Sequence, residues 1–187
     1  MAQRILLTSP QFIKNFTNVS DNLSGKLLET AISEAQNYGL RTVLGDRLVD
    51  KLEYLVDQNQ VNAAGNEAYK DLLSKIQYYL AYTAVANVCM LTTVKIDNAG
   101  LEQVSDEHME PLSVTQSFKL SDYYQRKADY ICGQMQRFVL RNREAYPELT
   151  QADCYAIKAN LYSAATTGIW LGGVRGRGIR RPRCWRR

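Results

Sequence analysis

Apolar residues in the first third of the chain recur every three or four positions, the spacing of helices that bury one face. Ser9 followed by Pro10 predicts a short helix over 10–16, because serine can cap the free first-turn amides and proline suits the first helical position. The next apolar stripe predicts a helix over about 24–38, and we expect Gly39 to end it.

The middle of the chain predicts a third helix and then a long one. The third covers about 46–58, with Asp46 as its expected N-cap, and the polar stretch 58–65 predicts a loop. The long helix is expected over about 66–94, and its second half, 76–94, carries no charged residue. That length almost spans a bilayer, but many tyrosine, threonine and amide side chains would have to enter lipid. We therefore expect a central helix buried on most sides, and no membrane partner.

The segment 97–118 interrupts the helical pattern. Asn98 and Gly100 are turn residues, and the acidic stretch that follows predicts an irregular segment or a short β-hairpin. Ser113–Phe118 alternates polar and apolar residues, which also fits an extended arm. Helical periodicity resumes at Leu120, and its single apolar face predicts a helix that ends before Pro147.

The last helix is predicted from a start signal. Thr150, with Asp153 three residues later, resembles a capping box and predicts a helix over about 150–171. The fold class is therefore mainly α: a helical bundle of about six helices with an irregular or short β insertion and a flexible basic C-terminal tail. We expect one helical domain over 1–173 and an arginine-rich tail over 174–187.

The net charge of +4 hides a strong asymmetry. The last thirteen residues hold seven arginines and no acid, which leaves 16 basic against 19 acidic residues in 1–174. Such a tail can contact nucleic-acid phosphates, dock into an acidic groove of another protein, or act as a solubilising end. The candidate contact residues of this tail are Arg175, Arg177, Arg180, Arg181, Arg183, Trp185, Arg186 and Arg187.

Residues suited to catalysis or metal binding are sparse. The single histidine, His108, lies beside Glu107 and Glu110, and a solvated acidic loop is the favoured interpretation over a metal or acid–base site. The four cysteines are far apart and fit neither a disulfide framework nor zinc-ligand spacing, so a reducing cytoplasm is expected. We expect no enzymatic activity, no catalytic residue, no metal and no cofactor.

Tyrosine is unusually frequent, with 12 copies against 4 phenylalanines and 2 tryptophans. Tyrosines spaced around several faces of two helices cannot all enter one small core. Because tyrosine is enriched at protein interfaces, some are expected to contact other subunits. The candidate interface residues are Tyr78, Tyr82, Tyr123 and Tyr130.

Several stretches in a fixed order resemble the head–tail connector (adaptor or ring) proteins of tailed bacteriophages, especially those of crAss-like and other Bacteroidetes phages. The resemblance covers most of residues 9–173, and the order and spacing of the stretches carry it. The stretches are Ser9–Lys14 with Val19–Leu23, Ala31–Gln36 with Leu44–Leu48, and Lys119–Tyr124 with Asn160–Gly173.

The resemblance implies a structural role. Such a protein forms a homo-oligomeric ring, expected to be a dodecamer, beneath the portal protein and above the next connector or tail protein. It extends the DNA channel and resides in the neck of the virion. It is made in the host cytoplasm. The tail, 174–187, is then a candidate portal-docking element, with contact to packaged DNA left open.

The alternative interpretation is a nucleic-acid-binding helical protein, such as a packaging or regulatory factor, that uses its arginine-rich tail. The acidic balance of the body argues against it, as does the lack of a clear helix-turn-helix with a basic recognition helix.

Overall fold

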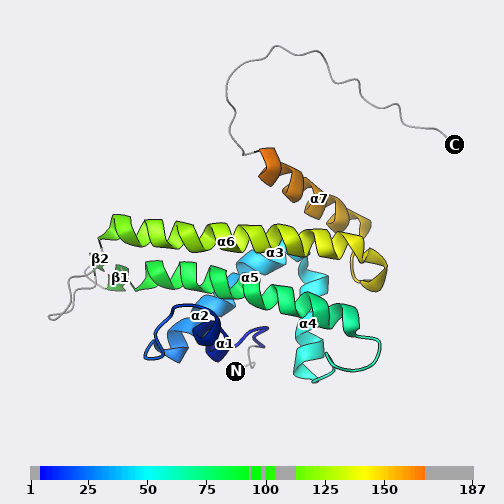
Figure 1. The fold of residues 1–187 in the computed structure, drawn as a ribbon, viewed down its shortest axis with the longest axis horizontal. Helices are drawn as coiled ribbons and strands as arrows, with labels where there is room; N and C mark the ends of the chain where they lie inside the picture. Colours follow the sequence, from blue (N-terminus) through cyan, green and yellow to red (C-terminus); the bar gives the residue numbers. More distant parts are fainter. Residues whose placement is uncertain (1–4, 93, 98–99, 104–112, 167–187) are drawn as a thin grey trace, which may run out of the picture.

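The computed structural model describes residues 5–92, 94–97, 100–103 and 113–166. These residues are mainly helical, as predicted (Figure 1). Because α2, the π-helical η1 and α3 follow one another without a break, the described residues form six helical rods. The elements are α1 (Pro10–Phe16), α2 (Gly25–Glu34), η1 (Ala35–Leu40), α3 (Arg41–Leu44), α4 (Asp46–Asp57), α5 (Glu67–Leu91), β1 (Val94–Asp97), β2 (Gly100–Gln103), α6 (Val114–Arg141), the 3₁₀ turn η2 (Arg143–Ala145) and α7 (Gln151–Thr166).

Helices α5 and α6 form a long antiparallel pair at the centre of the molecule (Figure 1). Helices α1, α2 and α4 extend on one side of α5, while α7 packs beyond α6. The short β1–β2 hairpin lies at the end of the pair where α5 stops and α6 starts. Among the described elements, no helix covers one long side of α6.

Two clusters of buried side chains hold the helices together, and α5 contributes to both. The larger cluster joins α3, α4, the first half of α5, the second half of α6 and α7, with Leu52, Ile76 and Met135 among its members. The smaller cluster joins α1 and α2 to the second half of α5, where Ala81 and Ala84 let the helices approach closely. The prediction that the long helix is buried on most sides is confirmed.

Within the described part of the chain, no helix combines the length and the apolar character that crossing a bilayer requires. The predicted helices over 10–16 and 46–58 and the loop over 58–65 are confirmed. The long helix ends at Leu91, three residues before the predicted boundary, because Val94 already belongs to β1.

Gly39 does not end a helix, so that prediction is wrong. It lies inside η1, and helical backbone continues to Leu44. A Cβ atom built on Gly39 would lie 2.7 Å from the hydroxyl oxygen of Tyr79, which is shorter than any normal contact. The glycine therefore provides room for a buried tyrosine of α5.

Asp46 is not the N-cap of α4, so that prediction is also wrong. Gly45 holds the N-cap position with a φ of 85°, and no side chain caps this helix. Asp46 is the first helical residue, and its carboxylate lies 3.6 Å from the guanidinium of Arg41. An acidic group in the first turn still favours the helix through its dipole.

The insertion contains a short hairpin but ends earlier than predicted. β1 and β2 pair antiparallel, from Val94 opposite Gln103 to Asp97 opposite Gly100. The stretch Ser113–Phe118 is the start of α6 and not an extended arm. A capping box explains this: the Ser113 amide donates to the Gln116 side chain at 2.9 Å, and the Gln116 amide donates to the Ser113 hydroxyl at 3.3 Å.

The predicted capping box of α7 is confirmed. The Thr150 amide donates to the Asp153 carboxylate at 2.9 Å, and the Asp153 amide donates to the Thr150 hydroxyl at 3.2 Å. These hydrogen bonds from Thr150 hold the pKa of Asp153 below its ordinary value. The predicted helix end near 171 and the tail 174–187 lie outside the described residues.

Candidate interaction surface

The uncovered side of α6 carries an alternation of basic residues and tyrosines. Ala128, Met135 and Val139 point into the core, and the residues on the opposite side of the helix are exposed, except for the half-buried Lys127. Between its first and last members the row spans about 33 Å, at 1.5 Å per helical residue. We call this row the α6 ridge: Lys119, Tyr123, Arg126, Lys127, Tyr130, Arg137 and Arg141.

The α6 ridge is strongly basic. Helix α6 holds five cations, all on the ridge, and two acids, Asp122 and Asp129. Asp122 forms an ion pair with Arg126 at 2.7 Å, with both side chains largely exposed, so this pair contributes little to stability. The remaining ridge cations form none of the ion pairs found among the described residues.

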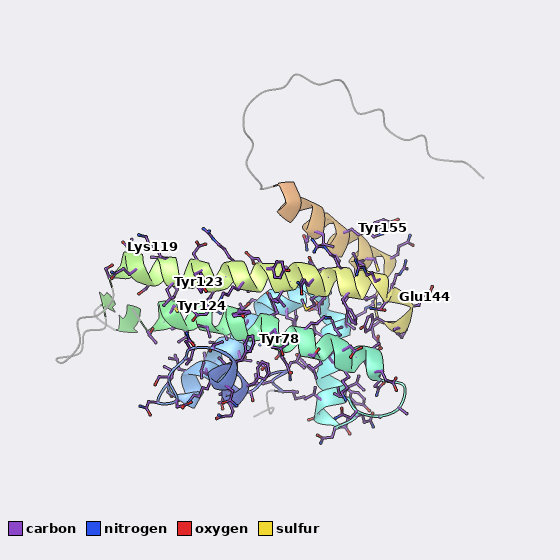
Figure 2. All side chains as sticks on the ribbon, in the orientation of Figure 1. Tyr78, Lys119, Tyr123, Tyr124, Glu144 and Tyr155 are labelled. Carbon is purple, nitrogen blue, oxygen red and sulfur yellow. The ribbon has the colours of Figure 1, made fainter. Side chains whose placement is uncertain are left out.

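Lys127 anchors the first half of the ridge to a group of tyrosines. Its ammonium lies 4.3 Å from the ring centroid of Tyr123, 5.4 Å from that of Tyr82 and 5.7 Å from that of Tyr124. A side-chain hydrogen bond with Tyr123 outweighs the effect of burial and raises the pKa of Lys127. The lysine therefore stays charged, and its cation–π contacts order the tyrosines. Figure 2 shows Tyr123 and Tyr124 on α6, with Lys119 toward the helix start.

The tyrosine group continues across α5 to α1. The ring of Phe16 lies 4.7 Å from that of Tyr78 and 5.3 Å from that of Tyr82, centroid to centroid. A cavity of about 360 Å³ opens beside these rings, with Lys75 and Gln134 also in its wall. Phe16 and Tyr78 remain 38% and 40% exposed, so the aromatic surface is accessible.

The structure brings three of the four candidate interface tyrosines together and separates the fourth. Tyr78, Tyr82 and Tyr123 belong to the aromatic group between α5 and α6. Tyr130 is 66% exposed and borders a different groove, of about 640 Å³, whose wall includes Val43 of α3 and Leu161 of α7. The candidate interface tyrosines therefore border two different cavities beside α6.

A second charged surface lies on α4. Arg41 contacts Asp50 at 2.6 Å, Glu53 at 3.0 Å and Asp46 at 3.6 Å. Burial lowers the pKa of Arg41, but the contacts with Asp50 and Glu53 outweigh it and raise the pKa overall. Asp46 and Asp50 are the first two acids of α4. Their helical spacing to Glu53 and Asp57 was the signal for a continuous acidic face.

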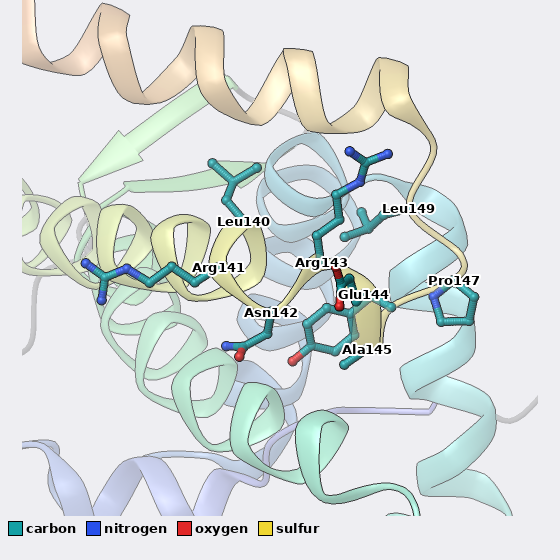
Figure 3. Close-up of a pocket in the computed structure, with 9 residues that line it drawn as sticks. Leu140, Arg141, Asn142, Arg143, Glu144, Ala145, Pro147 and Leu149 are labelled. Atoms are coloured by element: carbon teal, nitrogen blue, oxygen red, sulfur yellow. The ribbon is translucent and has the colours of Figure 1, made fainter.

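Helix packing also forms a larger cavity, of about 830 Å³, at the connection between α6 and α7 (Figure 3). Arg141 and Arg143 point in different directions there, and Glu144 is the acidic residue of the wall. The Tyr146 hydroxyl donates to the carbonyl of Ala68 at 2.8 Å, which fixes this connection against α5. The residues that line this cavity include no nucleophile paired with a base.

The other candidate chemical groups are buried or undescribed. Cys132 is half-buried, and burial raises the pKa of its thiol to about 11, which disfavours the reactive thiolate. Among the described residues, no three histidine, cysteine or acidic side chains gather as a metal site. His108 and all the candidate tail residues, Arg175 to Arg187, lie outside the described residues.

Comparison with known proteins places the chain in a family. Residues 40–159, more than half of the chain, match a family of unknown function, DUF6712. The chain belongs to DUF6712. The matched region contains the whole of α4, α5 and α6, so both the α6 ridge and the acidic residues of α4 lie within the DUF6712 segment. No curated protein and no solved structure matches this DUF6712 chain.

Proposed function

We propose that this DUF6712 protein is a non-enzymatic structural subunit of a phage head–tail connector. One copy acts as part of a homo-oligomeric ring, which bridges the portal protein to the next connector or tail protein and extends the DNA channel. The ordered resemblance over residues 9–173 supports this proposal, and the helical fold is compatible with it.

The observation that carries the proposal is the α6 ridge. Arginine and tyrosine are enriched at protein interfaces, and here they recur, together with two lysines, along about 33 Å of the longest helix, exposed in the single chain except for the half-buried Lys127. A surface of this length and composition is suited to contact with another macromolecule. Exposed tyrosines that serve no contact would be scattered over the surface and would not line up along one helix.

The position of the aromatic residues fits a ring in particular. A closed ring of identical copies uses two different surfaces of each copy, because its contacts run head to tail. Tyr78 and Tyr82 lie on the α5 side of α6, and Tyr130 borders the α7 side. The exposed rings of Tyr78 and Tyr130 therefore border two different cavities beside α6.

The finer parts of the proposal follow from the resemblance. We place twelve copies in the ring, to match the portal, and assign the ring to the neck of the virion after synthesis in the host cytoplasm. The tail, 174–187, docks on the portal protein. The competing function is a nucleic-acid-binding protein that uses the same tail, and the test below separates the two.

The test is electron microscopy and native mass spectrometry of the full chain, with and without its cognate portal protein. We expect a closed ring on the portal, with a copy number that matches the portal symmetry. A chain that stays monomeric under both conditions while binding DNA tightly through residues 174–187 would overturn the connector proposal in favour of the nucleic-acid protein.

A further inference from the structure

We infer that the α6 ridge of one copy packs against an acidic face of α4 on the next copy, so that two oppositely charged helices form the lateral contact of the ring. This inference rests on the proposed ring and names the surfaces that close it. The acidic face consists of Asp46, Asp50, Glu53 and Asp57, with Tyr54 at its edge.

The acidic face lies on the outer side of α4. Leu48, Leu52 and Leu55 bury the opposite side of the helix, which turns the three aspartates toward solvent, while Glu53 is 20% exposed and pairs with Arg41. The side chains of Asp46 and Asp50 are 76% and 62% exposed. Arg41 neutralises part of this charge, and Arg47 and Lys51 of α4 lie beside the face, with the Lys51 ammonium 5.5 Å from the ring centroid of Tyr54. The acids still outnumber these basic residues, four to three.

The spacing of charges is the same on both helices. Asp46 and Asp57 are eleven residues apart on α4, and Arg126 and Arg137 are eleven residues apart on α6. At 1.5 Å per residue, each pair is separated by about 16.5 Å along its helix. Two helices laid side by side can therefore bring both ends of the acidic face to ridge arginines at once.

Apolar contact accompanies the charges. Tyr54 is 53% exposed beside the acidic face, and Tyr130, 66% exposed, lies between the two ridge arginines. Exposed ion pairs alone are weak because water and salt screen them. The tyrosine rings add apolar area, and their packing excludes water from the neighbouring pairs, which strengthens the attraction.

The two surfaces cannot satisfy each other within one chain. In Figure 1, α4 extends beyond α5 on the side away from α6. Complementary surfaces on different sides of one subunit generate a head-to-tail contact, which repeats from copy to copy and closes into a ring.

A second copy explains the ridge better than DNA does. A ring with every ridge turned into the channel would hold back DNA that has to pass through it. The matching acidic helix is present in the same chain.

The test is charge reversal with rescue in the full chain. Arg126→Glu with Arg137→Glu should reduce ring formation on the portal by about tenfold or more, since like charges then face each other. Asp46→Lys with Asp57→Lys should have the same effect, and the quadruple variant should recover the ring. Lys26→Glu with Lys70→Glu, two exposed lysines outside both surfaces, is the control with an equal change of charge.

Ring formation is measured by electron microscopy and native mass spectrometry, and circular dichroism checks that helical content is unchanged. If the wild type forms rings and the Arg126→Glu, Arg137→Glu variant forms them equally well, the inference is overturned while the connector proposal stands. A quadruple variant that stays unassembled also overturns the pairing. If the Arg126→Glu, Arg137→Glu variant forms intact rings that no longer retain DNA, the ridge is a DNA contact and the inference is overturned. If the wild type forms no ring on its portal, both proposals are overturned.

Discussion

Gly39 shows how one contact between two helices determines which residue type a position can hold. The position lies within helical backbone, where glycine weakens a helix by about 1 kcal/mol relative to alanine. Tyr79 fills the space that a side chain would occupy, and burial raises the pKa of its hydroxyl to about 12, so it stays neutral. The π-helical turn of η1 and the tyrosine therefore pack as a matched pair.

We expect Gly39→Ala to destabilise the protein by about 1–3 kcal/mol, because the new methyl group overlaps the Tyr79 hydroxyl in a close-packed core. In a Tyr79→Phe background the overlapping oxygen is absent, and the same substitution should then stabilise by up to about 1 kcal/mol through helix propensity. Urea denaturation followed by circular dichroism measures both differences. An equal effect of Gly39→Ala in the two backgrounds would exclude the proposed contact.

Helix starts are the features of single elements that sequence signals predict best here. Ser9 before Pro10 and Thr150 before Asp153 both mark starts that the structure confirms, because a cap is a local hydrogen-bond pattern. Ser113 belongs to the same class. The polar–apolar alternation after it favoured an extended arm over a helix, so the start of α6 was predicted six residues too late.

We expect Ser113→Ala to destabilise the first turn of α6 by about 1 kcal/mol, because the capping box loses the hydroxyl that accepts from the Gln116 amide. Hydrogen exchange at the amides of the first turn should speed up several-fold, while the middle of α6 is unchanged. Thr115→Ala is the control, since this exposed neighbour takes no part in the box. Equal acceleration in both variants would argue against the cap.

Helix ends and bends were predicted less well than starts. Gly39 carried the usual signal for a helix end. The prediction failed because this glycine is placed there to leave room for Tyr79 of α5. Asp46 carried the signal for a cap, but the backbone of Gly45, with its positive φ, occupies that position. Glycine occurs both at helix ends and at close contacts, and aspartate occurs both as an N-cap and in the first helical turn. The residues packed around each position determine which of the two roles it has.

At the scale of the whole molecule, the proposed assembly depends on surfaces from several elements. The aromatic group joins Phe16, Tyr82 and Lys127 from three helices that are far apart in the sequence. The α6 ridge and the acidic face of α4 belong to two different helices. Assembly through them is expected to weaken as salt rises, because the contact is partly electrostatic.

The tail provides a separate prediction. We expect Arg180→Glu with Arg181→Glu to abolish docking on the portal protein while leaving helical content unchanged, because reversed charges repel an acidic groove. Binding to immobilised portal measures docking, and circular dichroism measures the helices. Lys26→Glu with Lys70→Glu again matches the change of charge. Retained docking in the tail variant would show that residues 174–187 are not the portal-binding element.

The sequence by itself determined the helical fold class, the number of helical rods and most of their starts. Apolar periodicity and capping patterns involve residues that are close together in the sequence, so they can be recognised without the structure. It also singled out Tyr78, Tyr82, Tyr123 and Tyr130, because tyrosines spread around a helix cannot all be buried in a core of this size.

The tertiary structure decided which side of each helix is covered. It separated Tyr130 from the other three tyrosines, left the basic side of α6 exposed and set Gly39 against Tyr79. The net acidic balance of residues 1–174 hid the ridge, because an average over the sequence mixes the α6 cations with the acids of α4. Charge acts through distance in space, and those distances exist once the helices have packed.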